Sequence, residues 1–140
     1  MTGRAAVTVE SEAETARVAG ELAAALRPGA VVLLHGDLGA GKTAFVRGMA
    51  PSLGVDPDEV SSPTFALVQP YAGASVTLFH VDLYRIGGGE VEELGLDDFA
   101  ADGVLVVEWA ERWPRPPASA IHVRIEDLGG DRRRIVIEHP

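Results

Sequence analysis

The stretch that decides the fold runs Gly36-Asp37-Leu38-Gly39-Ala40-Gly41-Lys42-Thr43. It fits the pattern G-x-x-x-x-G-K-[ST], in which glycines let the backbone curl so that its amide groups point at a phosphate. The pattern needs a buried strand before it and a helix after it. Residues 30–35 form a continuous apolar run, and residues 46–53 carry apolar side chains at helical spacing. Residues 36–43 therefore predict a phosphate-binding loop between a strand and a helix.

The lysine of this loop is the only lysine in the chain, since 11 of the 12 basic residues are arginine. A chain that uses arginine for its other positive charges has kept one lysine, at the position that reaches the outer phosphates of a nucleotide. The hydroxyl of Thr43 stands where the pattern places a magnesium ligand. We expect the loop amides and Lys42 to bind phosphate, and Thr43 to bind Mg²⁺.

A phosphate loop needs a second, acidic magnesium ligand, usually at the end of a neighbouring buried strand. Glu108 follows the apolar residues 104–107, and Asp82 follows the mixed run 78–81. Glu108 ends the cleaner apolar run, although aspartate is the residue expected at this position. Both acids stay candidates, with Glu108 favoured.

The rest of the chain predicts one α/β domain over residues 1–140. A capping-box pattern at Ser11 and Glu14 begins an amphipathic helix that Pro28 ends. Pro51 should kink or end the helix that follows the phosphate loop. The remaining expected elements are an opening strand at 7–10, a hairpin of 65–69 and 75–81 with its turn at 71–74, a flexible loop at 87–89, an acidic helix at 90–94, a buried strand at 103–108, a loop at 113–117, and a closing hairpin of 121–125 and 133–137.

The charge, the cysteine content and the length of the apolar runs argue against several classes of function. The 21 acidic residues outnumber the 12 basic ones, for a net charge of −9, which disfavours broad binding to nucleic-acid backbones. The sequence has no cysteine, so disulfides and thiolate sites are excluded. No apolar run approaches the roughly 20 residues of a membrane span, and residues 1–10 lack a signal-peptide core. We expect a cytoplasmic protein without membrane contact.

The sequence also bears on the nucleotide. Guanine-specific proteins of this class commonly read the base with an Asn-Lys-x-Asp motif, but this chain has no asparagine and no second lysine. ATP is therefore the expected nucleotide. Two alternatives to an ATPase stay open: a docking module that binds ATP without turnover, and a small-molecule kinase, for which the residues after the loop leave little room.

Other side-chain groups carry weaker signals. The four histidines, at 35, 80, 122 and 139, have no metal-like spacing, and each is expected to be a strand or loop residue. The arginines at 132–134 form a local basic cluster, for which contact with a nucleotide or a partner is one reading. They alternate on a predicted strand and do not all point one way, so solvated side chains are favoured. Trp109 and Trp113 are expected to pack near Glu108.

Several motifs occur together in one order and spacing, and they resemble the bacterial ATPase family TsaE (YjeE), which serves threonylcarbamoyladenosine (t6A) modification of tRNA. The resemblance spans roughly residues 5 to 138. The motifs that carry it are the loop at 36–43, Ser62-Pro-Thr-Phe65, His80-Val-Asp-Leu-Tyr-Arg85, Glu93-Leu-Gly-Leu96 and Val107-Glu-Trp109.

This resemblance implies a P-loop NTPase-like three-layer α/β fold with a mixed, partly parallel central sheet and antiparallel hairpins. It also implies ATP and Mg²⁺ as cofactors, slow ATP hydrolysis, and association with the transferase TsaD and its companion TsaB. Contact with tRNA is then expected to be indirect or weak, because another subunit holds the tRNA.

The resemblance also implies functional roles for the residues that match the motifs of the family. Lys42 and Thr43 match the phosphate and magnesium ligands, Glu108 resembles the family's metal ligand, and Asp82 resembles an acid needed for hydrolysis. Thr64 lies in a segment resembling a nucleotide-sensing switch, so Asp82, Lys42 and Thr64 are the catalytic candidates. Trp109 matches a tryptophan near the site, and Ser11, in the segment 11–15, matches the part of the family that approaches the adenine.

Overall fold

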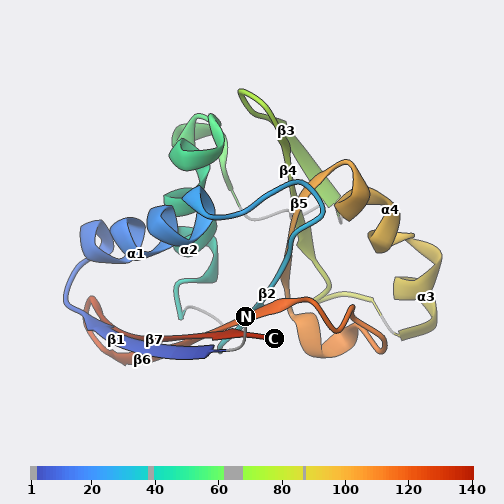
Figure 1. Ribbon diagram of the computed structural model, residues 1–140. Helices are drawn as coiled ribbons and strands as arrows, with labels where there is room; N and C mark the ends of the chain where they lie inside the picture. Colours follow the sequence, from blue (N-terminus) through green and yellow to red (C-terminus); the bar gives the residue numbers. More distant parts are fainter. Residues whose placement is uncertain (1–2, 38–39, 62–67, 87) are drawn as a thin grey trace.

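One mixed sheet organises the chain. The computed structural model describes residues 3–37, 40–61, 68–86 and 88–140 (Figure 1). Within these residues the sheet has seven strands in the order β1-β7-β6-β2-β5-β4-β3. The strands are β1 (Gly3–Val9), β2 (Val31–His35), β3 (Val68–Ala72), β4 (Thr77–Asp82), β5 (Gly103–Glu108), β6 (Ile121–Gly129) and β7 (Arg132–His139).

The centre of the sheet is parallel and its margins are antiparallel. Strand β2 pairs in parallel with both β5 and β6, and β4 pairs in parallel with β5. The hairpins β3–β4 and β6–β7, and the pair β1–β7, are antiparallel. Strands β2 and β5 are buried almost throughout, as their continuous apolar runs predict for strands covered on both faces. The predicted mixed sheet with antiparallel hairpins is confirmed.

Helices cover both faces of the sheet, which makes three layers (Figure 1). Helices α1 (Glu12–Ala24) and α2 (Lys42–Met49) lie over one face, and α3 (Gly88–Glu93) and α4 (Leu96–Ala101) lie over the other. Two buried clusters fill the spaces between the layers. Side chains alternate between them along the central strands: Val32 and Leu34 of β2 join the α1/α2 cluster, whereas Leu33 joins the α3/α4 cluster.

Two local predictions are confirmed at atomic detail. The Ser11 hydroxyl accepts a hydrogen bond from the amide of Glu14 (3.1 Å) and so caps α1. The Glu14 carboxylate accepts from the amide of Glu10 (2.8 Å), one residue earlier than a capping box requires. Helix α2 ends at Met49, and Pro51 lies in the short 3₁₀ helix η1 (Ala50–Leu53) that follows. Two further 3₁₀ turns are η2 (Pro57–Glu59) and η3 (Ala110–Arg112).

Other predicted boundaries are wrong. The turn expected at 71–74 begins later, because Tyr71 is buried and pairs with Leu78, so β3 continues through Ala72. Two of the glycines expected in a flexible loop, Gly88 and Gly89, belong to α3, and Gly87 lies outside the described residues. The opening strand is longer than expected because β1 pairs with β7 along its whole length. No helix in the described part of the chain is long and apolar enough to cross a membrane.

The topology brings three segments to one edge of the sheet. Strands β2, β4 and β5 are parallel, so their carboxyl ends lie at the same edge. The loop at 36–43 follows β2, Asp82 is the last residue of β4, and Glu108 is the last residue of β5. In such sheets, ligands bind at the carboxyl ends of the strands.

Candidate functional site

Glycines stand at both described ends of the loop between β2 and α2. A Cβ added at Gly36 would lie 2.7 Å from the carbonyl oxygen of Ile125, so only glycine lets the loop pass this close to β6. Gly41 has φ +106°, a left-handed conformation that glycine adopts without strain, and its carbonyl accepts the amide of Phe45 (2.9 Å). The first turn of α2 begins directly after Gly41, and the amides at the start of a helix have no partner within it and stabilise an anion.

Lys42 curls back over this loop. Its side chain is buried (5% exposed), its Nζ donates to the carbonyl of Gly36 (2.7 Å), and Nζ lies 4.0 Å from the centroid of the Trp109 ring. Trp109 has φ +58°, the one positive φ outside glycine in the described residues. A left-handed tryptophan costs of order 1–3 kcal/mol, a cost that usually marks a functional position. The strained residue here forms the wall against which the lysine ammonium rests.

Thr43 and the acid at the end of β5 are in direct contact. The Thr43 hydroxyl donates to Oε2 of Glu108 (3.2 Å), and Glu108 is 4% exposed. Both groups offer oxygen ligands of the kind Mg²⁺ prefers, and neighbouring oxygens in an octahedral magnesium shell are about 3 Å apart. The donor set and its spacing therefore fit a magnesium ion held between Thr43 and Glu108.

A second donor reaches the same carboxylate. His80 is fully buried in β4, and its Nε2 lies 2.5 Å from Oε2 of Glu108. A carboxylate accepts hydrogen bonds, so in this pair the imidazole Nε2–H is the donor and the Glu108 oxygen the acceptor. The other ring nitrogen, Nδ1, is buried and has no hydrogen-bond partner among the described residues.

Asp82 lies beside Glu108, its register partner across β4 and β5. Burial raises the pKa of Asp82 above its ordinary value, and the Glu108 charge raises it further, whereas the amide of Tyr84, which donates to Oδ1 (2.9 Å), lowers it. Of the two acids, Glu108 contacts Thr43 directly. Asp82 is placed beside that contact, where its carboxylate can hold or polarise a water molecule.

An aromatic pair borders the site. The rings of Tyr84 and Trp109 are in contact, with centroids 4.8 Å apart, and Tyr84 is 47% exposed. The Arg112 guanidinium lies 5.9 Å from the Tyr84 ring centroid and donates to the carbonyl of Ile86 (3.3 Å). Trp113 instead packs in the α3/α4 cluster, as expected for a packing residue.

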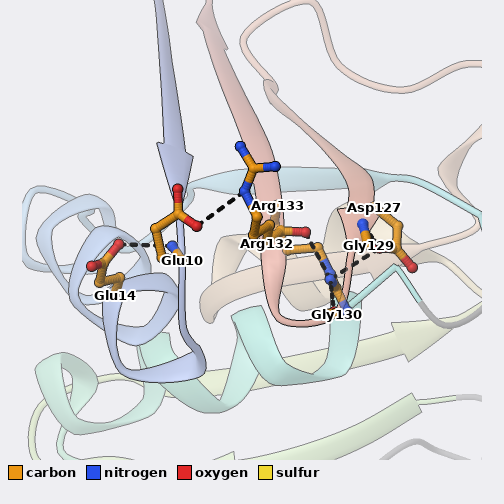
Figure 2. Close-up of polar contacts among 7 residues, drawn as sticks. All are labelled: Glu10, Glu14, Asp127, Gly129, Gly130, Arg132 and Arg133. Atoms are coloured by element: carbon orange, nitrogen blue, oxygen red, sulfur yellow. Dashed lines mark hydrogen bonds and ion pairs between the residues drawn. The ribbon is translucent and has the colours of Figure 1, made fainter.

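The middle arginine of the β6–β7 hairpin is tied to the phosphate loop. Arg133 Nε donates to the carbonyl of Ala40 (2.7 Å), and its Nη1 donates to Gly130 O (2.7 Å), Arg132 O (2.8 Å) and Asp127 Oδ1 (3.1 Å). Figure 2 shows the contacts of Arg133 at the hairpin turn, with Arg132 pointing the other way toward Glu10; Ala40 is not drawn there. The expectation of solvated arginines is therefore wrong for Arg133, because the hairpin brings it against a loop 93 residues away.

A small cavity of about 40 Å³ lies beside Gly41, between α1, α2 and the β6–β7 hairpin. Its lining residues come from α1, α2, the phosphate loop and the hairpin turn: Glu12, Thr15, Gly41, Ala44, Asp131 and Arg133. Ser11 does not line this cavity and is engaged as the cap of α1. Its predicted place beside the adenine stays a prediction.

His35, the last residue of β2, contacts another histidine. His35 stacks on His122 of β6, with ring centroids 5.2 Å apart, and His35 Nε2 lies 2.9 Å from His122 Nδ1. Burial lowers the pKa of His35, and the nearby charges of Arg124 and His122 lower it further, while Glu111 raises it.

The structure thus brings together Lys42, Thr43, Glu108 and Asp82, which sequence reasoning singled out. Asp37 is exposed at the loop, and Thr64, Leu38 and Gly39 lie outside the described residues. Sequence reasoning missed the contacts of His80 and Arg133. The two-residue spacing of His80 and Asp82 on one strand was a usable signal, because it puts both on one face. For Arg133 no local signal existed.

Comparison with known proteins identifies the family of this chain. The family described as "Threonylcarbamoyl adenosine biosynthesis protein TsaE" matches residues 9–135. The chain belongs to the TsaE family. Among TsaE relatives, that of Bacillus subtilis is 42% identical, covering 91% of this chain and 80% of its own length. That of Aquifex aeolicus is 41% identical, covering 94% and 93%. Both bear the name tRNA threonylcarbamoyladenosine biosynthesis protein TsaE.

The fold comparison agrees with this TsaE assignment. The crystal structure of YdiB from Bacillus subtilis superposes with a TM-score of 0.78 at 33% identity, covering 99% of this chain and 87% of the other. The expected resemblance to TsaE and the P-loop fold are both confirmed.

Proposed function

We propose that this chain binds ATP with Mg²⁺ at residues 36–43 and hydrolyses it slowly, in support of t6A modification of tRNA. The observation that carries the proposal is the contact between Thr43 at the start of α2 and Glu108 at the end of β5, with Lys42 beside it. Helix N-terminus, lysine, hydroxyl and acid are the parts with which P-loop proteins hold a nucleoside triphosphate. Family membership supports the biological context.

In this proposal each group has one task. The loop amides and Lys42 bind the outer phosphates, while Thr43 and Glu108 hold the magnesium ion, which when bound offsets the negative charge of the phosphates. Asp82 orients the attacking water. Lys42 must leave the Gly36 carbonyl and turn toward the phosphates, which its long side chain and its contact with the Trp109 face allow.

Turnover by the chain alone should be slow. Phosphoryl transfer is accelerated by an arginine near the transferring phosphate, and supplying one is worth about 10³ to 10⁵ in rate. Arg112 is bonded to the carbonyl of Ile86, and Arg133 is bonded to the loop backbone and to Asp127. The missing charge would come from partners, for which TsaD and TsaB are the proposed proteins. With a net charge of −9, contact with tRNA would be indirect.

Calorimetry with ATP and MgCl₂ tests the binding step. Lys42→Ala should weaken ATP binding at least tenfold, because it removes the ammonium group that is proposed to bind the outer phosphates. Gly41→Val should do the same through the backbone, since valine does not tolerate φ +106°. Arg17→Ala removes one exposed charge on α1 and is the matched control, expected to bind like the parent. Unchanged ATP affinity in both loop variants would overturn the proposal.

Phosphate release measured with and without purified TsaD and TsaB tests the second step. We expect a slow rate alone and a higher rate with the partners. Rapid turnover by the lone chain would remove the role of the partners. ATP binding with no release under either condition would favour the docking module, and phosphate transfer to a metabolite would favour the kinase.

A further inference from the structure

His80 is a fully buried polar side chain in contact with Glu108, and the proposed function leaves it without a task. On strand β4 it shares a face with Leu78 and Asp82, and across the sheet its register partner is Val106 of β5. Leu78 and Val106 belong to the apolar cluster under α1 and α2. A histidine therefore stands where the surrounding packing calls for an aliphatic side chain.

Burying an imidazole here is unfavourable unless its hydrogen bonds offset the free energy lost when the ring leaves water. One nitrogen, Nδ1, has no partner in the described part of the chain, and a buried unpaired polar atom destabilises the fold. The other, Nε2, makes a short hydrogen bond to Glu108. A leucine would fill the same layer without the unpaired nitrogen, so packing alone does not explain His80.

The contact acts on a single oxygen. Oε2 of Glu108 accepts both from His80 Nε2 (2.5 Å) and from the Thr43 hydroxyl (3.2 Å). Two donors from different elements, β4 and α2, therefore hold the carboxylate of β5 in one orientation. The shorter contact comes from the rigid, fully buried ring, and the longer one from the residue that is itself a proposed magnesium ligand.

From this geometry we infer that His80 is a positioning residue that orients the Glu108 carboxylate for magnesium. The inference rests on the proposed function, because it assigns His80 a part in the magnesium site of Thr43 and Glu108. Donors that orient a metal-binding side chain typically change metal affinity about 10- to 100-fold when removed. His80 does not touch the nucleotide in this scheme. Its removal should leave metal-free ATP binding unchanged while weakening the response to Mg²⁺.

The test is a MgCl₂ titration of ATP affinity, followed by calorimetry, on three variants. His80→Leu removes the donor and keeps an apolar filling, and should raise the magnesium concentration for half-maximal tightening about 10- to 100-fold. His80→Gln keeps an N–H near the position of Nε2 and should stay within about threefold of the parent. Leu78→Ala, on the same face of the same strand, weakens the core and should leave the magnesium titration unchanged, which separates lost stability from lost positioning.

Several outcomes would overturn the inference. They are a parent-like magnesium titration in folded His80→Leu, an equal loss in the leucine and glutamine variants, or a matching loss in Leu78→Ala. If the parent protein itself binds no ATP, or shows no magnesium dependence, the proposed function fails rather than the role of His80.

A measurement on the unmodified protein covers the case in which His80→Leu does not fold. Imidazole ¹⁵N spectra should show a slowly exchanging Nε2 proton on His80, shifted downfield by the carboxylate. This signal should move when MgCl₂ is added to the ATP complex, because the ion draws on the same carboxylate. A signal that is absent, or that ignores magnesium while ATP affinity responds to it, would contradict the inference.

Discussion

Three consecutive arginines at the start of β7 offer a sharp test of how the phosphate loop is held. Arg133 is 17% exposed and bonds the loop carbonyl of Ala40, whereas Arg132 is 55% exposed and pairs with Glu10 on the surface. Arg134 is also exposed, with Glu126 4.0 Å away. The structure therefore predicts that replacing the middle arginine affects the protein far more than replacing its neighbours.

The expected size follows from the contacts. A hydrogen bond from a charged donor contributes about 1.5–3 kcal/mol when it is shielded, as the bond to the Ala40 carbonyl is. The three bonds from Nη1 lie at the surface and add little. Arg133→Ala should lower the free energy of unfolding by about 2–3 kcal/mol, which corresponds to a fall in melting temperature of about 5–10 °C. Arg132→Ala removes an exposed ion pair, worth about 0–1 kcal/mol.

Urea denaturation followed by circular dichroism measures the stability of both variants. Calorimetry on folded Arg133→Ala should also show ATP binding weakened about three- to tenfold, or about 1 kcal/mol, since the loop loses its tie to the hairpin. Equal losses in the two alanine variants, or a change below about 0.5 kcal/mol in Arg133→Ala, would refute the reasoning from burial and geometry.

Three further predictions concern single titratable side chains. Glu108→Ala should abolish the tightening of ATP binding by MgCl₂ while metal-free binding persists, because the loop amides are untouched; a parent-like titration would move the role of metal ligand to Asp82. Asp82→Ala should abolish phosphate release in the reconstituted system while calorimetry still shows ATP binding, and retained turnover would exclude Asp82 from catalysis. Burial lowers the pKa of His35 below its ordinary 6.5, so below that pH the unfolded state binds the proton more readily. Unfolding free energy should therefore fall as pH drops through 6.5 toward the lowered pKa, and urea denaturation at a series of pH values should show a smaller slope in His35→Gln; an equal slope in this variant would contradict the prediction.

Local chemistry determined the phosphate loop and the elements around it. The phosphate-loop motif is complete within the eight consecutive residues 36–43, so its glycines, lysine and threonine predict the loop without any distant contact. The cap at Ser11 and the end of α2 before Pro51 are likewise effects of near neighbours on the backbone, and both were predicted. The continuous apolar runs of β2 and β5 predicted strands buried on both faces.

Boundaries that depend on partners far along the chain were predicted less well. β1 extends back to Gly3 because β7 pairs with it, and β3 runs through Ala72 because the Tyr71 ring is buried. Neither effect is visible in the residues themselves. Short-range patterns identify an element, whereas the length of a strand depends on its neighbour in the sheet.

The same division holds for the candidate site. Sequence alone nominated Lys42, Thr43, Glu108 and Asp82 and left the two acids as competing metal ligands. Only the parallel pairing of β4, β5 and β2 brought the acids to the loop and put Glu108, rather than Asp82, against Thr43. The contacts of His80 with Glu108 and of Arg133 with Ala40 span 28 and 93 residues, and contacts of that range arise only when the sheet closes. Residue types set what chemistry is available, and tertiary packing decides which of those groups meet.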